Sequence, residues 1–333
     1  MYFVVYIFSM SFWNTLKKPI LALAPMADVT DTAFRAVIAA HGKPDVMWTE
    51  FVSADGLYHT RERHGVQDAE NPLMHALRFT ESERPIVAQL FGSNVETMEY
   101  AARLVAGLGF DGIDINMGCP DKSVEKQGAG AALMKNPEHA RRIIAAAQKG
   151  AGSIPVSVKT RIGYSKNELA TWLPELLKES PAAVTLHART RKEMSLVPAR
   201  WEHVAEAVEI RDALLSRALI LGNGDIESVA DAREKVAASG ADGAMLGRAI
   251  FGNPWLFAGK KTEDIPIAQR LAVLLEQCYL FETYTPRKHF AVMKKHFKSY
   301  TTGMHGAAEL REKLMECNSA DEVAEVVALL GEN

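Results

Sequence analysis

One cysteine of this chain stands where a thiol could take part in chemistry. Cys119 lies in a Gly-Cys-Pro turn just beyond a β-rich run that ends at Asn116. A thiol on such a loop can act as a nucleophile or as a proton donor. No pair of His and Asn at the other strand ends suggests a protease-like dyad, so we interpret Cys119 as a proton donor. Cys278 and Cys317 fall on helical stripes, and we interpret both as packing residues.

Polar side chains of several kinds recur where other short β-rich runs end. Burying many polar groups together costs free energy unless a polar ligand pairs with them, so this pattern predicts a binding site. His187 could ligate a metal, but no second His or carboxylate stands at metal-ligand spacing, and a hydrogen bond to a bound cofactor is favoured. The whole group comprises Gln89, Lys159, Arg161, His187, Arg189, Asn223, Asp225 and Arg248.

Glycine turns follow the last two β-rich runs and indicate the kind of ligand. Gly222-Asn223-Gly224-Asp225 and Gly247-Arg248 each precede the start of a helical pattern. Glycines let backbone N–H groups approach a phosphate, and an arginine adds a forked donor. Such turns also occur as plain connections. The two together, in register with the last two strands, predict a phosphate-binding site.

Eight β-rich runs alternate with helical stretches over about 250 residues, which is the size and order of a (β/α)8 barrel. Several runs are apolar on both faces, as in a parallel sheet covered by helices. A doubly wound sheet is the rival fold, but it needs a glycine-rich turn after the first strand, and Ala24–Asp28 contains no glycine. The predicted strands are Ile20–Met26, Val46–Phe51, Ile86–Phe91, Gly112–Asn116, Val156–Ile162, Ala183–Ala188, Ala218–Gly224 and Gly243–Ala249.

Helical periodicity connects these strands and continues alone after them. Beyond about Ile265 only helical patterns remain, which predicts a small all-helical domain. We therefore divide the chain into a short apolar leader at 1–15, a catalytic barrel at 16–260 and a helical domain at 261–333. The predicted barrel helices include Thr97–Leu108, Pro137–Lys149, Asn167–Glu179, Trp201–Val208 and Ile226–Ser239.

The composition is that of an ordinary soluble globular protein. Of the 333 residues, 48% are hydrophobic and 24% are charged, and the formal net charge is −3. Three widely spaced cysteines exclude a disulfide framework and a cysteine-rich zinc module, and favour the cytoplasm. The apolar stretch Met1–Phe8 is too short to span a bilayer and lacks a preceding basic residue, so we expect neither a membrane anchor nor a signal peptide.

The motifs along the barrel resemble those of the tRNA-dihydrouridine synthases, a family of FMN-dependent enzymes. Asn116-Met117-Gly118-Cys119-Pro120 is the most specific of them, whereas the glycine turns are shared with many flavin barrels. Gly306–Arg311 in the tail also resembles the C-terminal domain of the family. The other matching stretches follow in the family's order and are Leu23–Asp31, Gln89–Gly92, Val158–Arg161, His187–Arg191, Gly222–Ile226, Gly247–Ala249 and Asn253–Phe257.

The resemblance implies that FMN lies across the barrel mouth and that NADPH or NADH supplies its electrons through the same opening. It also implies that Asn116 and Arg161 orient a uracil, while Cys119 protonates C5 and hydride reaches C6. Neither the residues nor the resemblance assigns a role to Glu50, near the end of the second predicted strand, beyond that of orienting its neighbours. The residues expected to contact FMN are Pro25, Met26 and Ala27 beneath it, Gln89, Lys159 and His187 around the flavin ring, and Asn223, Gly224, Asp225, Gly247 and Arg248 at its phosphate.

The charge pattern of a segment after the barrel supports RNA binding independently of the family resemblance. Read as one helix at about 100° per residue, Arg287 to Tyr300 places its apolar residues on one side and its cations on another. The apolar stripe predicts core packing, whereas cations without a neighbouring acidic residue suit a phosphate backbone. We therefore expect a monomer that binds tRNA, with no protein partner. The RNA-contacting cations would be Arg287, Lys288, Lys294, Lys295 and Lys298, together with Arg189 on the loop after the sixth strand.

Three other functions compete with this one. A flavin barrel that acts on a small pyrimidine-like molecule explains the thiol and the phosphate turns but leaves the basic tail without a purpose. A tRNA-binding flavoprotein without turnover is disfavoured by Cys119, Lys159 and Arg161. A non-redox phosphate-binding barrel is disfavoured because no Schiff-base lysine or carboxylate pair is evident at the strand ends.

Overall fold

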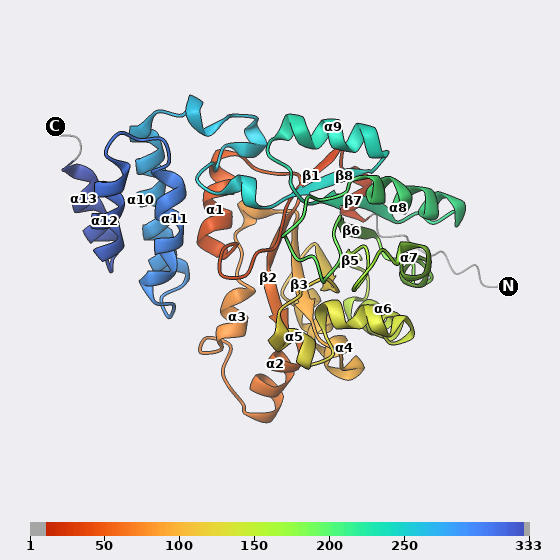
Figure 1. Cartoon of the computed structure of the whole chain (residues 1–333). Coiled ribbons are helices and arrows are strands. Elements are labelled where there is room, and N and C mark those ends of the chain that lie inside the picture. Colours follow the sequence, from red (N-terminus) through yellow and green to blue (C-terminus); the bar gives the residue numbers. More distant parts are fainter. Residues whose placement is uncertain (1–10, 330–333) are drawn as a thin grey trace.

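The computed structural model describes residues 11–329. Eight parallel strands form one sheet in the order β1-β8-β7-β6-β5-β4-β3-β2 (Figure 1). A parallel bridge between Ala22 and Val46 brings β1 beside the start of β2, so the sheet curls round on itself. The predicted (β/α)8 barrel is confirmed, with β1 Ile20–Leu23, β2 Met47–Ser53, β3 Ile86–Phe91, β4 Gly112–Asn116, β5 Val156–Arg161, β6 Ala183–His187, β7 Leu219–Asn223 and β8 Gly243–Leu246.

Two strands, β1 and β8, end three residues earlier than predicted, and both endings have local causes. β1 stops at Leu23 rather than Met26 because the chain turns at Pro25, which has no amide to donate to a ladder. β8 stops at Leu246 rather than Ala249 because Arg248–Ile250 forms a 3-10 turn. Each shortened strand leaves a loop at the carboxyl end of the barrel, where loops carry function in this fold.

Most of the helices around the sheet begin at side chains that cap them, although α7 and α8 do not. Asp31, Asn136 and Ser228 accept backbone amides in the first turns of α1, α6 and α9. The five predicted barrel helices agree with α4 and α6–α9 within a few residues, except that α8 continues beyond Val208 to Ala213. The bounds are α1 Thr32–His41, α2 Ala54–Tyr58, α3 Pro72–Ala76, α4 Val95–Gly107, α5 Lys122–Lys126, α6 Pro137–Ala151, α7 Leu169–Leu177, α8 Glu202–Ala213 and α9 Val229–Ser239.

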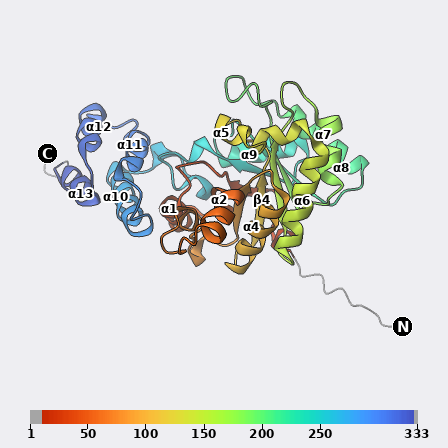
Figure 2. The same cartoon turned by 90° about the horizontal axis from the view of Figure 1, so that it is seen from below.

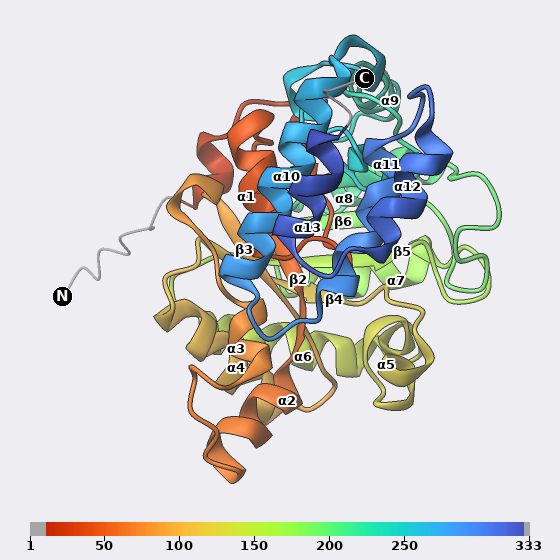
Figure 3. The same cartoon turned by 90° about the vertical axis from the view of Figure 1, so that its left-hand side faces the viewer.

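Four helices after the barrel share a hydrophobic core of their own, and we call them the helical unit. Leu274, Phe297, Leu314 and Val323 are completely buried in it. Figure 3 shows the four helices side by side in front of the barrel. The predicted all-helical C-terminal region is thus confirmed, with α10 Ile267–Tyr284, α11 Lys294–Tyr300, α12 Ala307–Glu316 and α13 Ala320–Ala328.

The segment from Arg287 to Tyr300 is not the single helix that its periodicity predicts. Phe290–Met293 forms a 3-10 turn, and only Lys294–Tyr300 is α-helical. The apolar stripe of this segment is core, as predicted, because Phe290, Met293, Phe297 and Tyr300 are all buried. Arg287 and Lys288 precede both the 3-10 turn and the α-helix, so they do not share one helical face with the later lysines.

The helical unit is attached to the barrel through α1. Ala33 and Val37 on α1 belong to the same hydrophobic cluster as the residues of α10. His41 Nε2 lies 2.7 Å from Glu276 Oε2 across this junction. Figure 2 shows α10 and α1 side by side. The unit is thereby held next to the loop that follows β1, because that loop leads into α1.

Residues 11–15, which we expected to belong to the leader, pack against the barrel instead. Phe12–Thr15 forms a 3-10 turn, and the Trp13 side chain is buried among residues that fill the barrel interior. The remainder of the predicted leader, 1–10, lies outside the described residues. Within residues 11–329, no helix combines the length and the apolar character needed to cross a bilayer.

Candidate active site

A cavity of about 570 Å³ opens at the carboxyl ends of β5–β8 and beside the loop after β1. Its size and its few convergent polar groups are typical of a small-molecule or cofactor site. Most of the residues expected to contact a cofactor are brought together here. They are Pro25, Met26, Lys159, His187, Asn223, Gly224, Asp225, Gly247 and Arg248, and Arg189 and Ser195 line the same cavity.

The end of the cavity at β7 and β8 is rich in positive charge and free amides. Asp225 accepts hydrogen bonds from Arg189 and, at 2.7 Å, from Arg248 Nη2. These arginines hold the pKa of the Asp225 carboxyl below its usual range. In the turns and loops of residues 11–329, the amides of Gly224, Asp225 and Gly247 donate to no backbone carbonyl. This end therefore offers an anion two guanidinium groups and several unpaired donors.

Glycine is required at the turn that follows β7. Gly224 has φ +121°, and an added Cβ would lie 2.8 Å from the Cβ of Ala199. At Gly222 an added Cβ would meet the ring of Trp201 at 2.3 Å. Trp201 Nε1 also donates to the Gly224 carbonyl at 2.9 Å, which turns that carbonyl toward α8. The loop can thus present its amides to the cavity only with these small residues in place.

Lys159 and His187 occupy the middle of the cavity wall. Lys159 Nζ donates to Asn223 Oδ1 at 3.2 Å, and burial, followed by the charge of Arg161, lowers the pKa of Lys159 to about 8. Burial and the neighbouring cations hold the pKa of His187 well below its ordinary value, so the imidazole is neutral. Arg189 Nη1 donates to His187 Nε2 at 3.0 Å. The ring proton therefore lies on Nδ1, where it can be donated to a ligand.

Gln89 lies beneath the site and does not line the cavity. Its Nε2 donates to Asp114 Oδ2 at 2.7 Å, and its Oε1 accepts from Asn116 Nδ2 at 3.1 Å. Burial raises the pKa of Asp114 to about 6. Asp114 is a member of this network that was not predicted as a site residue. The available signal was a carboxylate between Ile113 and Ile115 in a strand, because a buried charge needs partners.

The turn that carries Cys119 is held by two predicted substrate residues. Asn116 Oδ1 accepts the backbone amides of Gly118 at 3.1 Å and Cys119 at 2.8 Å. Arg161 Nε donates to the Gly118 carbonyl at 2.8 Å. Burial raises the pKa of the Cys119 thiol, so the thiol carries its proton at neutral pH. A half-buried, protonated thiol on a fixed turn can serve as a general acid.

Three predicted contact residues are not placed as expected. Arg161 and Arg189, which were predicted to contact RNA, are buried, and Ala27, which was predicted to contact the cofactor, does not line the cavity. Arg161 is mostly buried, and its Nη1 donates to the carbonyls of Thr190 and Met194 on the loop after β6. The Arg189 side chain is 2% exposed and lines the cavity rather than an outer surface. Ala27 is exposed beside the cavity without lining it.

The cations of the tail do not form the uniform face that we expected. Lys288 Nζ lies 3.1 Å from Glu50 Oε2. Arg287 Nη1 donates to the Glu70 carbonyl at 3.0 Å, and Lys294 Nζ donates to the Met315 carbonyl at 2.6 Å. The expectation of unpaired charge is thus wrong for Lys288, because Glu50 comes from a distant part of the sequence.

Comparison with known proteins identifies the family. The sequence model described as "Dihydrouridine synthase (Dus)" matches residues 22–332. The chain belongs to the dihydrouridine synthase family. It is 39% identical over 320 residues to a probable tRNA-dihydrouridine synthase of Staphylococcus epidermidis, covering 95% of each chain. It is also 39% identical over 316 residues to a probable tRNA-dihydrouridine synthase 2 of Bacillus subtilis, covering 94% of each chain.

Solved structures show a similar fold at low sequence identity. Histamine dehydrogenase from Rhizobium sp. 4-9 matches 92% of this chain and 62% of its own, with a TM-score of 0.51 and 13% identity. This likeness is limited to the fold, since function is carried by the site rather than by the barrel.

Proposed function

We propose that this protein reduces the C5=C6 bond of specific uridines in tRNA to dihydrouridine, with bound FMN and with NADPH or NADH as the reductant. The observation that carries the proposal is that Cys119 lies near Lys159, which lines the cavity, closely enough for their charges to interact. The cavity combines a cationic end with neutral and charged donors, and a protonated Cys119 stands on the turn after β4. Membership of the dihydrouridine synthase family supports the same reaction.

The residues of the cavity fit FMN in size and charge. Arg248 and the free amides of Gly224 and Gly247 would hold the phosphate. Asp225 would orient Arg248 through its carboxylate rather than contact the phosphate with it, because two anionic groups repel each other. Lys159 would stabilise negative charge on the reduced ring.

Around the flavin ring, Pro25 and Met26 would form the wall of the site, and His187 Nδ1 would donate a hydrogen bond. FMN supplies hydride-transfer chemistry when it is bound. Gln89 would act indirectly, since its amide fixes the side chain of Asn116.

The substrate side of the site is formed by Asn116, Arg161 and Cys119. With hydride added at C6, the Cys119 Sγ–H bond breaks and its proton joins C5, so the uracil ring gains two hydrogens in total. The thiolate then regains a proton from water. Arg161 and Lys159 carry positive charge near Sγ, which stabilises that thiolate between turnovers.

A uridine in folded tRNA must leave its stack to reach this cavity. The helical unit lies beside the loop after β1 and would bind the tRNA backbone while one base enters. Its proposed phosphate contacts are Arg287, Lys294, Lys295 and Lys298.

Nucleoside mass spectrometry tests the proposal directly. Unmodified tRNA is incubated with purified protein, FMN and NADPH, and the uridine pool is examined for a gain of two hydrogen atoms. We expect that gain with the wild type and not with Cys119→Ala. A yellow protein that oxidises NADPH but leaves tRNA unchanged would instead indicate a flavin barrel for a small pyrimidine-like molecule.

A further inference from the structure

The loop after β1 forms part of the cofactor cavity, and its shape depends on a carboxylate from another strand. Met26 on this loop lines the cavity. Asp28, two residues later, has φ +56°, a left-handed conformation that costs free energy outside glycine and needs support from its surroundings. The Asp28 amide donates to Glu50 Oε1 at 2.5 Å. Glu50 stands on β2 and therefore holds the tip of the loop.

The second oxygen of the same carboxylate binds the helical unit. Lys288 Nζ lies 3.1 Å from Glu50 Oε2, and the Glu50 side chain is only 10% exposed. One buried carboxylate therefore contacts the cavity loop through one oxygen and the chain leading into α11 through the other. Lys295 on α11 is also close enough for its charge to interact with Asp28 and Glu50.

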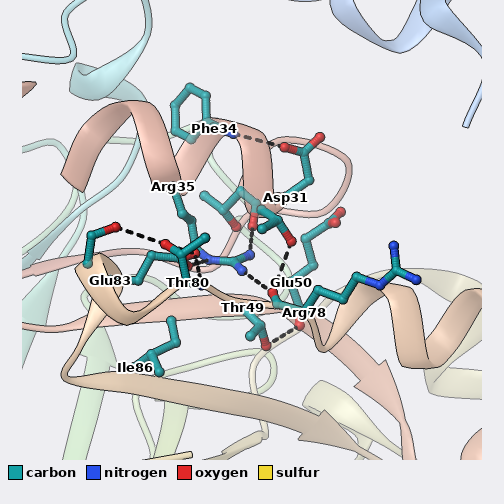
Figure 4. Close-up of polar contacts among 12 residues, drawn as sticks. Asp31, Phe34, Arg35, Thr49, Glu50, Arg78, Thr80, Glu83 and Ile86 are labelled. Carbon is teal, nitrogen blue, oxygen red and sulfur yellow. Dashed lines mark hydrogen bonds and ion pairs between the residues drawn. The ribbon is translucent and has the colours of Figure 1, made fainter. Parts of the chain in front are cut away.

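The other end of the loop is anchored within the barrel. Figure 4 shows Arg35 between Glu83 and the backbone of neighbouring segments. Arg35 Nε donates to Glu83 Oε2 at 2.6 Å, and its Nη1 donates to the Thr30 carbonyl at 2.6 Å. The Arg35–Glu83 pair is completely buried, so this end of the loop is fixed without help from the helical unit.

The contact between Glu50 and Lys288 is not surrounded by tight packing. A second cavity of about 140 Å³ lies at this junction, and both residues line it together with Asp31 and Thr285. The ion pair is therefore the main polar link between β2 and the helical unit at this place among the described residues.

We propose that Glu50 is a positioning residue that makes the shape of the cavity loop depend on the placement of the helical unit through Lys288. This inference rests on the proposed function, because the helical unit is where tRNA would dock and the loop is where the flavin would lie. Docking of tRNA would then favour one arrangement of Lys288, Glu50 and the Asp28 amide, and with it one position of Met26 against the cofactor.

Kinetics on the full-length holoenzyme separate this role from simple phosphate binding by Lys288. We expect Lys288→Met and Glu50→Gln each to lower kcat at saturating tRNA by about tenfold, because each removes a charge-assisted contact. The double variant should be no worse than either single variant. Lys288→Arg should restore most of the rate.

The control is Lys149→Met, which removes another lysine from a carboxylate, Glu99, on the outside of the barrel. A rise in KM for tRNA with unchanged kcat in Lys288→Met, and no effect of Glu50→Gln, would overturn the proposal.

Hydrogen exchange provides a readout that needs neither tRNA nor cofactor. We expect the amides of residues 24–31 to exchange faster in Lys288→Met and in Glu50→Gln than in the wild type or in Lys149→Met. Equal exchange in all four proteins would refute the coupling. If the wild type forms no dihydrouridine, the proposed function fails, and the exchange of residues 24–31 still decides whether Lys288 acts on this loop.

Discussion

Asn116 accepts the backbone amide of Cys119 through its side-chain oxygen at 2.8 Å. The nitrogen of the same carboxamide donates to Gln89, which is in turn bonded to Asp114. The thiol is thereby connected to a buried polar network at the centre of the barrel.

Replacing Asn116 should slow the reaction without removing the acid. In Asn116→Ala the amides of Gly118 and Cys119 lose their acceptor, and we expect the single-turnover rate of uridine reduction to fall by about tenfold, as for one lost hydrogen bond. The rate of cofactor reduction by NADPH should stay within about twofold, since no proton from Cys119 is needed there. Equal losses in both steps would show that the turn does not position the thiol.

The acid itself should give a distinctive pH profile. Burial raises the pKa of the Cys119 thiol, so the proton to be donated is retained through neutral pH and lost only in alkaline solution above the ordinary range of a cysteine. The rate of uridine reduction should therefore be flat around neutrality and fall as the pH rises beyond that range. Measurement of single-turnover rates against pH tests this. A rate that declines already below neutral pH would exclude Cys119 as the acid.

Lys159 should make FMN binding sensitive to pH. The pKa of Lys159 is lowered to about 8, mainly by burial, so its ammonium group loses the proton as the pH rises through this value. The affinity for FMN, titrated by flavin fluorescence, should fall over the same interval because a positive charge disappears from the cavity. Lys159→Arg should remove this dependence, since a guanidinium stays charged. Identical pH profiles for the two proteins would contradict the prediction.

Arg248 should contribute to FMN binding through the phosphate. The Arg248 side chain is 65% exposed at the rim of the cavity, where Asp225 holds it. We expect Arg248→Met to weaken FMN binding by about tenfold, which is the effect of one charge-assisted hydrogen bond. Riboflavin, which lacks the phosphate, serves as the matched ligand, and its affinity should hardly change. Equal losses for both ligands would place Arg248 against the ring system.

The buried pair of Arg35 and Glu83 should dominate the response of stability to mutation near the cavity loop. Both side chains are completely buried, so Arg35→Met leaves an uncompensated carboxylate and should reduce the free energy of unfolding by about 3–5 kcal/mol. Urea denaturation followed by circular dichroism measures this loss. Arg35→Met combined with Glu83→Leu should recover part of it. A double variant less stable than Arg35→Met would argue against an uncompensated charge as the cause.

Much of the fold could be predicted because its signals are local. A strand such as Ile86–Phe91 is a short apolar run between turns, and its observed bounds equal the predicted ones. The polar residues at strand ends were also predictable as a group, since parallel strands of a barrel direct their carboxyl ends to one face. The cavity accordingly collects Lys159 on β5 and Met245 on β8, which the sequence separates by 86 positions.

The roles within that group could not be predicted, because they depend on contacts between distant residues. Gln89 and Lys159 both lie near the carboxyl ends of barrel strands, yet Gln89 lies beneath the cavity and Lys159 lines it. Lys288 was expected to be unpaired because 287–300 contains no acidic residue, whereas its partner Glu50 is 238 positions away. Periodicity likewise does not register the 3-10 turn at Phe290–Met293, since apolar residues keep the same spacing through it.

Two tryptophan side chains pack at the end of the barrel opposite to the cavity. Trp13 lies 6.0 Å from Trp48, ring centre to ring centre, and both are buried with the residues that fill the barrel interior. Aromatic side chains therefore pack the amino-terminal end of the barrel interior. On the proposed function, pyridine nucleotide and uridine would both reach the cavity at the carboxyl ends of β5–β8 and would occupy it in turn. The enzyme would release its first product before admitting its second substrate, which is the behaviour of a ping-pong mechanism.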